Sequence, residues 1–318
     1  MSVNANKPSR WKKDIAASVD CFNKWFMTFA PSTYRTARAQ TVWRVREALE
    51  RTKDLRSISA DVLGSQPGIL QTLRMATAPP IARDRLIGLA QVNPGLVDAM
   101  EKSKRVPPRM ASAELSVQLE RISAVLRALA DADLFPWLEN GRTPTSNERM
   151  RAATVVADRL TGALADPIIR NAQEQRQLDA ASTFLRSRGY TSLDAGARAA
   201  FTDIPAGKYA VHLNVPVRSE RGKHVNIPVD LVVRPHRSKE RYPLLIEAKS
   251  AGDFANVNKR RKEEATKIHQ LRRSYGESIR LILLLCGYFD TGYLGYEAAE
   301  GLDWVWEHRL EDLVDLGI

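Results

Sequence analysis

Cysteine is almost absent from this sequence, which contains only Cys21 and Cys286 among its 318 residues. The two lie far apart in the chain, and each is surrounded by apolar residues. We therefore expect two separate buried thiols in a reducing compartment, and neither a disulfide nor a metal-binding pair. Histidine is also scarce, and the five histidines show no HxxxH spacing, which argues against a zinc site.

Long hydrophobic runs are missing too. A membrane-spanning helix needs about 18 consecutive apolar residues, whereas the longest run here, Leu281–Cys286, has the length of one buried strand. The first residues contain no signal-peptide core, because Lys7, Arg10, Lys12 and Lys13 interrupt them. These absences predict a cytoplasmic protein with no membrane partner.

The chain does carry an excess of positive charge, with a formal net charge of +11. Such an excess favours polyanionic partners through long-range attraction and counterion release. The basic residues are mostly arginine, but a GC-rich genome produces the same bias. The net charge, rather than the choice of arginine, supports nucleic-acid binding.

The first half of the chain shows helical patterning throughout. Trp11, Ile15, Val19 and Phe22 recur at spacings of three and four, which is typical of one buried helix face. Similar stretches follow up to about residue 164, separated by prolines, and none shows strand-like alternation. We expect residues 1–165 to form a helical domain that contributes to DNA recognition.

The pattern changes at about residue 166. Asp166 and Pro167 resemble a helix cap and first turn, which predicts a helix from there to Gly189. Further elements are predicted in the order strand 209–217, strand 225–233, strand 242–249, helix 258–275 and strand 279–286. This α-β-β-β-α-β order predicts an α/β fold, a mixed sheet with helices on both faces, over residues 166–318. The acidic, aromatic segment 286–318 is expected to serve packing or dimerisation.

Two of the predicted strands carry a set of charged residues. Glu247 and Lys249 are two residues apart at the end of an apolar run, so a strand presents them on one face. Asp230 ends an apolar stretch on the preceding strand, and pairing of the two strands would bring it about 5 Å from Glu247. Neighbouring carboxylates repel each other unless a cation joins them. A hard divalent ion fits such oxygen ligands, and Lys249 could orient or deprotonate the attacking water and stabilise charge on a phosphate.

The acid-x-Lys triplet has little specificity by itself, because this composition produces one or two by chance. Glu247-Ala248-Lys249 is the only one in the chain, and its place at a strand end, one hairpin after Asp230, supplies the specificity. The alternative interpretation is an ordinary salt-bridged sheet surface.

The constellation resembles the PD-(D/E)xK nuclease superfamily, with Pro228-Val229-Asp230 in place of a direct Pro-Asp. More narrowly, most of the chain from about residue 145 is similar to the XamI family of type II restriction endonucleases. The segments that carry this resemblance include Asp166–Gln175, Asn226–Asp230, Leu245–Phe254, Asn256–Ala265, Cys286–Asp290, Gly295–Ala299 and Trp304–His308.

The resemblance implies Mg²⁺-dependent cleavage of double-stranded DNA at a short palindrome by a bacterial homodimer, with a cognate DNA methyltransferase as genetic partner. It also implies that Asp230 and Glu247 bind the metal, with the Ala248 carbonyl as a third ligand, and that Lys249 is the catalytic lysine. Some members of the superfamily have a further acid near the metal, for which Glu174 is a secondary candidate. A solvated carboxylate is an equally good interpretation of Glu174.

Four cations, Lys259, Arg260, Arg261 and Lys262, lie at the start of the helix that follows the predicted catalytic strand. A helix start beside a phosphate-cutting site is well placed to bind the DNA backbone. The alternative is a solvated face in which Glu263, Glu264 and Lys267 pair with these cations along the helix.

Two other functions remain open at this point. A structure-specific nuclease, such as a resolvase or repair enzyme, could use the same core. A non-catalytic DNA-binding regulator could use the helical half alone.

Overall fold

The computed structural model describes residues 2–193, 200–218, 222–237, 240–254 and 257–318, the side chains of 257–261 excepted. The chain forms two compact units. Residues 1–29 and 170–318 form the first, here called the sheet unit, and residues 30–169 form the second, here called the helical unit. Two long helices, α1 (Pro8–Arg51) and α7 (Ser146–Ser187), contribute to both.

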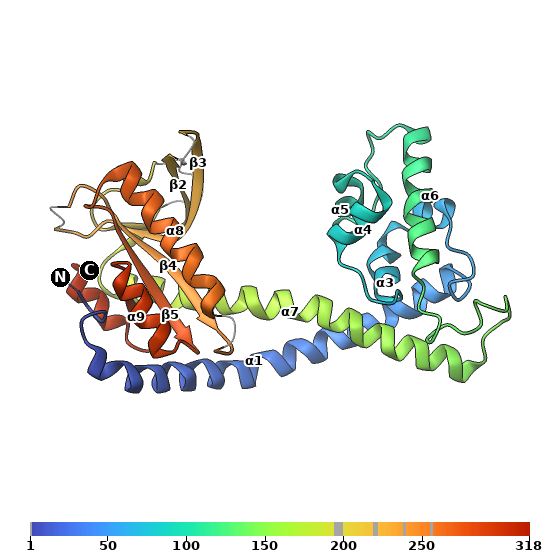
Figure 1. Cartoon of the computed structure of the whole chain (residues 1–318), viewed down its shortest axis with the longest axis horizontal. Helices are drawn as coiled ribbons and strands as arrows, with labels where there is room; N and C mark the ends of the chain where they lie inside the picture. The colour runs from blue at the N-terminus through green and yellow to red at the C-terminus, as the bar shows by residue number, and fades with distance from the viewer. Residues whose placement is uncertain (1, 194–199, 219–221, 238–239, 255–256) are drawn as a thin grey trace. The chain divides into compact units, whose positions relative to one another are not determined.

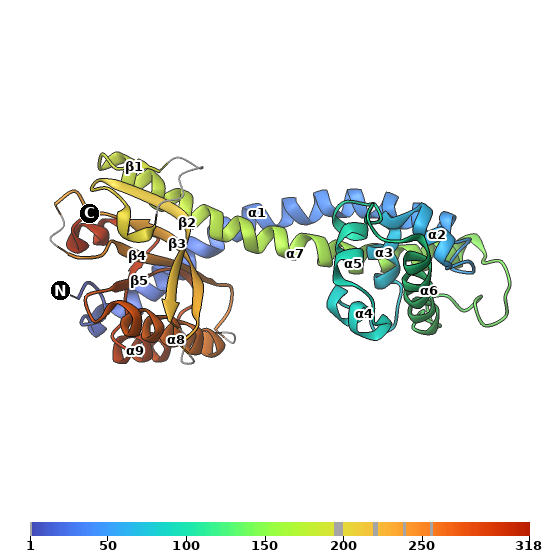
Figure 2. The ribbon, with the colours of Figure 1, turned by 90° about the horizontal axis from the view of Figure 1, so that it is seen from above.

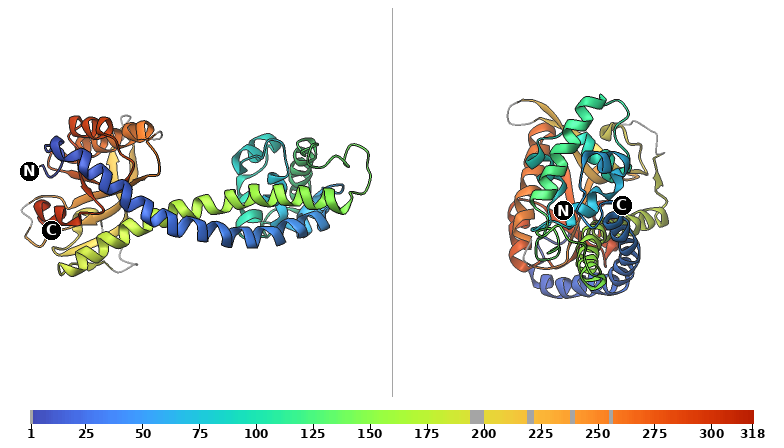
Figure 3. Two further views of the ribbon diagram at one scale, coloured as in Figure 1. Left: turned by 90° about the horizontal axis from the view of Figure 1, so that it is seen from below. Right: turned by 90° about the vertical axis from the view of Figure 1, so that its right-hand side faces the viewer.

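The helical unit packs α1 and α7 with a set of shorter helices around one apolar core (Figure 1). In this unit α1 and α7 lie side by side, and the Thr41 and Thr161 hydroxyls are 2.8 Å apart between them (Figure 3). Leu70, Leu96 and Trp137 are fully buried in the core. The shorter elements are α2 (Ala60–Ser65), η1 (Pro67–Ile69), α3 (Leu70–Met75), α4 (Arg83–Ala90), α5 (Pro94–Lys102) and α6 (Ser112–Ala128).

The helix predicted to begin at Asp166 begins 20 residues earlier. Pro167 lies inside α7, which runs unbroken for 42 residues. A proline inside a helix removes one backbone hydrogen bond and costs about 3 kcal/mol. Pro167 and its neighbours Asp166 and Ile168 are exposed, and the helix nevertheless continues to Ser187. The capping pattern at Asp166-Pro167 was therefore a wrong indication of a helix start.

The sheet unit contains a six-stranded mixed sheet whose strands lie in sequence order (Figure 2). Its strands are β1 (Thr191–Ser192), β2 (Lys208–Arg218), β3 (His224–Val233), β4 (Leu244–Ala251), β5 (Arg280–Gly287) and β6 (Asp303–Trp306). The pairs β2–β3 and β3–β4 are antiparallel, whereas β4–β5 and β5–β6 are parallel. The remaining elements are η2 (Phe201–Asp203), α8 (Val257–Tyr275), α9 (Thr291–Ala299) and η3 (Leu310–Leu316). This mixed sheet with its helices confirms the predicted fold class.

Each face of the sheet has its own core. On β5, Ile282 and Leu284 join the cluster that includes Leu178 of α7. Leu281 points to the opposite face, where it joins Ile268 and Leu271 of α8. This alternation follows from the period of two along a strand. The same alternation decides which face of the sheet the β4 side chains point to. Leu245 packs with the α8 cluster, so Glu247 and Lys249 face α8 as well.

The first 29 residues pack in the sheet unit, although their helical pattern grouped them with residues up to 165 in the sequence-based division. The backbone N–H groups of Asn4 and Ala5 donate to Asp303 Oδ1, both at 2.9 Å. Arg309 forms a bidentate ion pair with Asp14 of α1 at 2.6 and 2.9 Å. The other predicted boundary, at 165, lies close to the division at Ile169 and Arg170.

The expectation of two separate cysteines was wrong. The sulfur atoms of Cys21 and Cys286 and a carboxylate oxygen of Glu307 lie within 4.8 Å of one another. Sequence distance was the reason for the error, because Cys21 belongs to the part of α1 that packs on the sheet.

The aromatic C-terminal segment is core. Phe289, Trp304 and Trp306 are fully buried in one cluster, with Trp11 of α1 packed against it. Among the described residues, no helix is both long enough and apolar enough to cross a membrane.

Candidate active site

The strand pairing brings Asp230 to Glu247. Leu231 of β3 pairs with Ile246 of β4, so Asp230 and Glu247 are the next residues at the end of this ladder, and Glu247 is close enough to act electrostatically on Asp230. The Ala248 N–H donates a 2.8 Å hydrogen bond to Asp230 Oδ2. The predicted hairpin therefore forms, and the two carboxylates are neighbours.

A chain of buried charges continues from Glu247 to α8. Lys249 Nζ lies 3.2 Å from Glu247 Oε1 and 3.5 Å from Glu264 Oε1. Lys267 Nζ lies 2.7 Å from Glu247 Oε2 and donates to the Pro228 carbonyl at 2.8 Å. Glu247 is 7% exposed and Glu264 only 1% exposed. Buried ions persist when they are paired in this way.

These charges keep Lys249 protonated. Burial by itself disfavours the ammonium form, but Glu247 and Glu264 outweigh it and raise the pKa of Lys249 above its usual value. An ammonium group cannot accept a proton, so this lysine suits charge stabilisation and the orientation of a polar group better than general-base catalysis.

Asp230 is in the opposite situation. Burial is the main cause that raises the pKa of Asp230 to about 6, the neighbouring carboxylates Glu247 and Glu174 add to it, and the Ala248 N–H opposes it. Neighbouring carboxylates make this group hard to ionise, and a bound cation would stabilise its ionised form.

Glu174 of α7 comes close to Asp230, together with a residue that the sequence did not single out. One ligand atom each from Glu174, His212 and Asp230 lie within 4.8 Å of one another. Two carboxylates and an imidazole form a donor set that a divalent ion can use. The donors present therefore fit a metal ion.

His212 has an unusual backbone conformation. Its φ is +53°, in the left-handed region that L-residues seldom adopt. It also marks a change of face in β2: Tyr209 and Val211 pack toward α7, whereas Leu213 and Val215 pack with the α8 cluster. The ladder skips the pair of His212 with Asp230. Strained residues of this kind are frequent at functional sites.

The same exchange of faces occurs in β3. Leu231 packs on the α7 side of the sheet, and Val229 packs on the α8 side. Period two alone would put both on one face. The sheet is thus interrupted between these residues, at Asp230 itself, and this interruption frees Asp230 from regular pairing.

We expect His212→Gly to fold as well as the native protein, because glycine adopts positive φ without a steric penalty. His212→Val should be less stable than His212→Gly by about 1–2 kcal/mol, since its Cβ clashes in the left-handed region. Urea unfolding of the two variants measures the difference. Equal stability would show that the left-handed conformation is not retained in solution.

The other predicted residues are placed as follows. Ala248 pairs with Leu284 in the parallel β4–β5 ladder and donates its N–H to Asp230. Lys259, Arg260 and Arg261 belong to the first turns of α8, but their side chains lie outside the described residues. Lys262 is exposed on the same helix.

Comparison with known proteins identifies the family. The family model of the XamI restriction endonuclease matches residues 53–306. The type II restriction enzyme SalI of Streptomyces albus G is 53% identical over 316 residues, which are 99% of each chain. The chain belongs to the XamI restriction endonuclease family. This membership confirms the predicted class, a type II restriction endonuclease that cleaves DNA at a specific sequence.

Two more distant matches contribute less to the identification of the family. The type II restriction enzyme XamI of Xanthomonas campestris pv. amaranthicola is 25% identical over 198 residues, 62% of this chain and 64% of its own. The crystal structure of protein VC1899 from Vibrio cholerae matches 80% of this chain and 55% of its own at 14% identity. Its TM-score of 0.29 is too low to indicate a shared fold.

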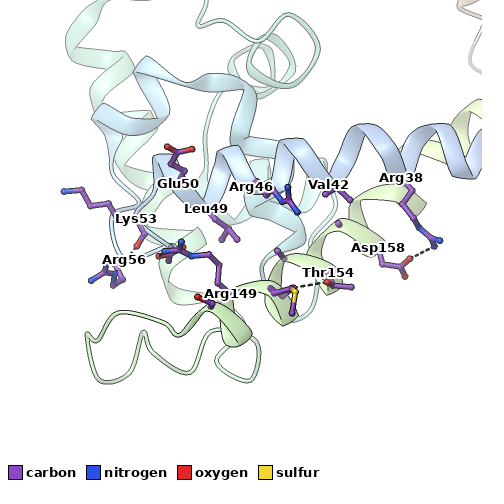
Figure 4. A pocket seen from close by; sticks show the side chains of 15 residues that line it. Arg38, Val42, Arg46, Leu49, Glu50, Lys53, Arg56, Arg149, Thr154 and Asp158 are labelled. Carbon is purple, nitrogen blue, oxygen red and sulfur yellow. Dashed lines mark hydrogen bonds and ion pairs between the residues drawn. The ribbon is translucent and has the colours of Figure 1, made fainter.

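The helical unit of this restriction endonuclease has a basic cavity of its own, of about 1040 Å³, between α1 and α7 (Figure 4). Five cations line it: Arg38, Arg46, Lys53, Arg56 and Arg149. Two of them are paired with acids, Arg38 with Asp158 at 3.1 Å and Arg149 with Asp54. The exposed apolar side chains of Val42 and Met150 also line the cavity.

Glu264 and Lys267 were not predicted as parts of the candidate site; they entered only the alternative interpretation, as partners of the helix-start cations. A signal was available. Glu264 precedes Ile268 by four residues and Leu271 by seven, so all three lie on the buried face of α8. A charge on a helix face that is otherwise apolar indicates a paired or functional group. For His212, no pattern in the sequence predicted the left-handed backbone conformation.

Proposed function

We propose that this restriction endonuclease hydrolyses phosphodiester bonds of double-stranded DNA at a short palindrome with Mg²⁺, at a site formed by Asp230, Glu247 and Lys249. We further propose that it acts as a homodimer in the bacterial cytoplasm, with a DNA methyltransferase that protects the host. Type II restriction endonucleases generally depend on a divalent metal. The observation that carries the proposal is the 2.8 Å contact that joins Asp230 to the strand of Glu247 and Lys249.

In this proposal Asp230 and Glu247 hold the Mg²⁺, with the Ala248 carbonyl as a third ligand. The ion, when bound, supplies Lewis-acid stabilisation of the phosphate and lowers the pKa of water. Glu174 and His212 extend the donor set on the side of α7 and β2, since their ligand atoms lie within 4.8 Å of Asp230. Carboxylate oxygens suit Mg²⁺, and an imidazole suits it less well. We therefore assign Glu174 the larger contribution.

Lys249 acts as the charged catalytic lysine. Its ammonium group is fixed between Glu247 and Glu264, and its raised pKa keeps the charge at neutral pH. A fixed cation stabilises the negative charge that develops on the phosphate oxygens. Lys267 has a supporting role, because it neutralises the second oxygen of Glu247.

DNA contacts are proposed in two places. The start of α8, with Lys259, Arg260, Arg261 and Lys262, would bind the backbone near the cleavage site. The helical unit would contribute to recognition, and its basic cavity gives this part of the proposal a local basis. Palindromic sites are read by two-fold symmetric dimers, which motivates the homodimer.

Digestion of a plasmid of known sequence tests the function. We expect discrete fragments with identical ends when Mg²⁺ is present, and intact plasmid when it is chelated. A smear, or cleavage confined to branched DNA, would favour a structure-specific nuclease instead. DNA binding without any cleavage in Mg²⁺ would favour the non-catalytic regulator.

A further inference from the structure

The two cysteines of the chain meet in the sheet unit, and neither is one of the proposed metal ligands. Cys21 comes from α1 and Cys286 from the end of β5. Their sulfur atoms and one Glu307 carboxylate oxygen lie within 4.8 Å of one another. Positions separated by 265 residues in sequence therefore form one cluster.

The packing of α1 fixes this encounter. Ser18, one helical turn before Cys21, accepts a 2.7 Å hydrogen bond from the Gly287 N–H, next to Cys286. Asn23 accepts a 2.9 Å hydrogen bond from the Tyr288 hydroxyl. Gly287 can approach so closely because it has no side chain: a Cβ there would lie 2.1 Å from the Ala251 carbonyl oxygen. The helix is thus held against the strand end on both sides of the thiol pair.

A half-buried cation, Arg176, lies against the pair. Arg176 Nη2 donates to Cys286 Sγ at 3.2 Å and to Glu307 Oε2 at 2.8 Å. Its guanidinium also lies 4.9 Å from the centre of the Trp25 ring. A cation beside a thiol favours the thiolate form. The hydrogen bond to Cys286 is the main cause that lowers the pKa of Cys21 to about 7, against the effect of burial.

The two thiols differ in access. Cys21 is partly exposed, whereas Cys286 is 1% exposed. The main causes that raise the pKa of Cys286 are the hydrogen bond to Cys21 and then burial. An accessible thiolate beside a buried thiol is the arrangement of a reactive cysteine with its resolving partner.

We propose that Cys21 and Cys286 form a reversible dithiol site that is oxidised by low-molecular-weight disulfides. The Cys21 thiolate attacks one sulfur of the reagent, so that a Cys21 mixed disulfide forms and one reagent thiolate leaves. Cys286 then loses its proton to solvent and attacks the Cys21 sulfur, which forms the Cys21–Cys286 bond and releases the second reagent thiolate. The protein is oxidised by two electrons, and the reagent disulfide is reduced to two thiols.

A metal site is the other chemistry that two cysteines and a glutamate could support. Arg176 argues against it, because its guanidinium already contacts both the Cys286 sulfur and the Glu307 carboxylate. A metal ion would have to displace this cation or lie beside it. Arg176 therefore supplies the positive charge that the sulfur and the carboxylate would otherwise take from a metal ion.

Treatment of the native protein with oxidised glutathione tests the proposal. We expect both thiols to disappear, an intact mass lower by two hydrogens with no glutathione attached, and full reversal by dithiothreitol. Peptide mapping should recover the segment around Cys21 joined to the segment around Cys286. These readouts need no variant.

Two serine variants separate the roles of the cysteines. Cys286→Ser should retain glutathione on Cys21, because the resolving thiol is missing. Cys21→Ser should leave Cys286 unmodified in the folded protein, because that thiol is buried. Either of two results for the native protein would overturn the proposal: thiols that stay free or keep a stable glutathione adduct, or stoichiometric Zn²⁺ in the isolated protein whose removal is needed before either thiol reacts.

Discussion

Replacing Lys249 with glutamine is expected to slow DNA cleavage by about 10²- to 10³-fold, the usual cost of losing one group that stabilises transition-state charge. Its ammonium lies between Glu247 and Glu264 at 3.2 and 3.5 Å, so the charge is fixed before DNA binds. Binding of the specific DNA site should be retained, because no recognition role is assigned to this residue. Cleavage rates and gel-shift titrations on one DNA fragment measure both effects.

Loss of Lys249 also removes a partner from two buried carboxylates, which is destabilising in itself. The double variant Lys249→Gln with Glu264→Gln removes one cation and one anion together, and therefore tests catalysis in a protein with balanced charge. It should fold and still fail to cut at the native rate. Lys13→Gln, an exposed lysine of α1, is the matched control for the loss of one positive charge and should leave cleavage unchanged. Cleavage at the native rate by the double variant would refute the catalytic assignment.

The second large effect is expected from Asp230→Asn, which should abolish cleavage and yet stabilise the metal-free protein. Burial raises the pKa of Asp230 to about 6 from a reference value of 3.8, and Glu247 and Glu174 contribute. Ionisation of this group at neutral pH therefore costs the folded state up to about 3 kcal/mol. Asparagine removes the charge and can still accept the hydrogen bond from the Ala248 N–H.

The sign of the pH dependence follows from the direction of the shift. A carboxyl with a raised pKa favours the folded state at low pH, and this contribution is lost as the pH rises from about 3.8 through about 6. The advantage of Asp230→Asn over the native protein should thus be largest at pH about 8 and shrink towards pH about 4. Urea unfolding in chelator at both pH values measures it. A variant that is less stable than the native protein at pH about 8 would contradict the account.

Much of the candidate site could be predicted from local pattern. The alternation of β4 put Glu247 and Lys249 on one face, and hairpin pairing put Asp230 beside Glu247. Such predictions succeed because the side-chain period of a strand and the register of a short hairpin are set by neighbouring residues. The helical pattern of α8 was equally predictable, although the part that Glu264 and Lys267 have in the buried charge cluster was not recognised.

The features that escaped prediction depend on contacts distant in sequence or on an exceptional backbone. Cys21 meets Cys286 only because the beginning of α1 packs on β5, and no local pattern specifies such a partner. The left-handed His212 has a residue type that gives no warning of positive φ. Pro167 lies inside α7, although an aspartate followed by a proline locally favours a helix start, so here the local pattern was misleading.

The sheet unit consists of two chain segments that are separated by the whole helical unit, which affects the order in which the two units can fold during synthesis. Asn4 and Asp14 are synthesised before the helical unit, but their partners Asp303 and Arg309 are synthesised after every residue of it. Domains generally fold as they become complete during synthesis. The helical unit can therefore fold early, whereas the sheet that carries Asp230 and Glu247 must wait for its outermost strand. A chain that stops before β6 thus lacks the strand and the two partners that complete the sheet unit, although its helical unit is already whole.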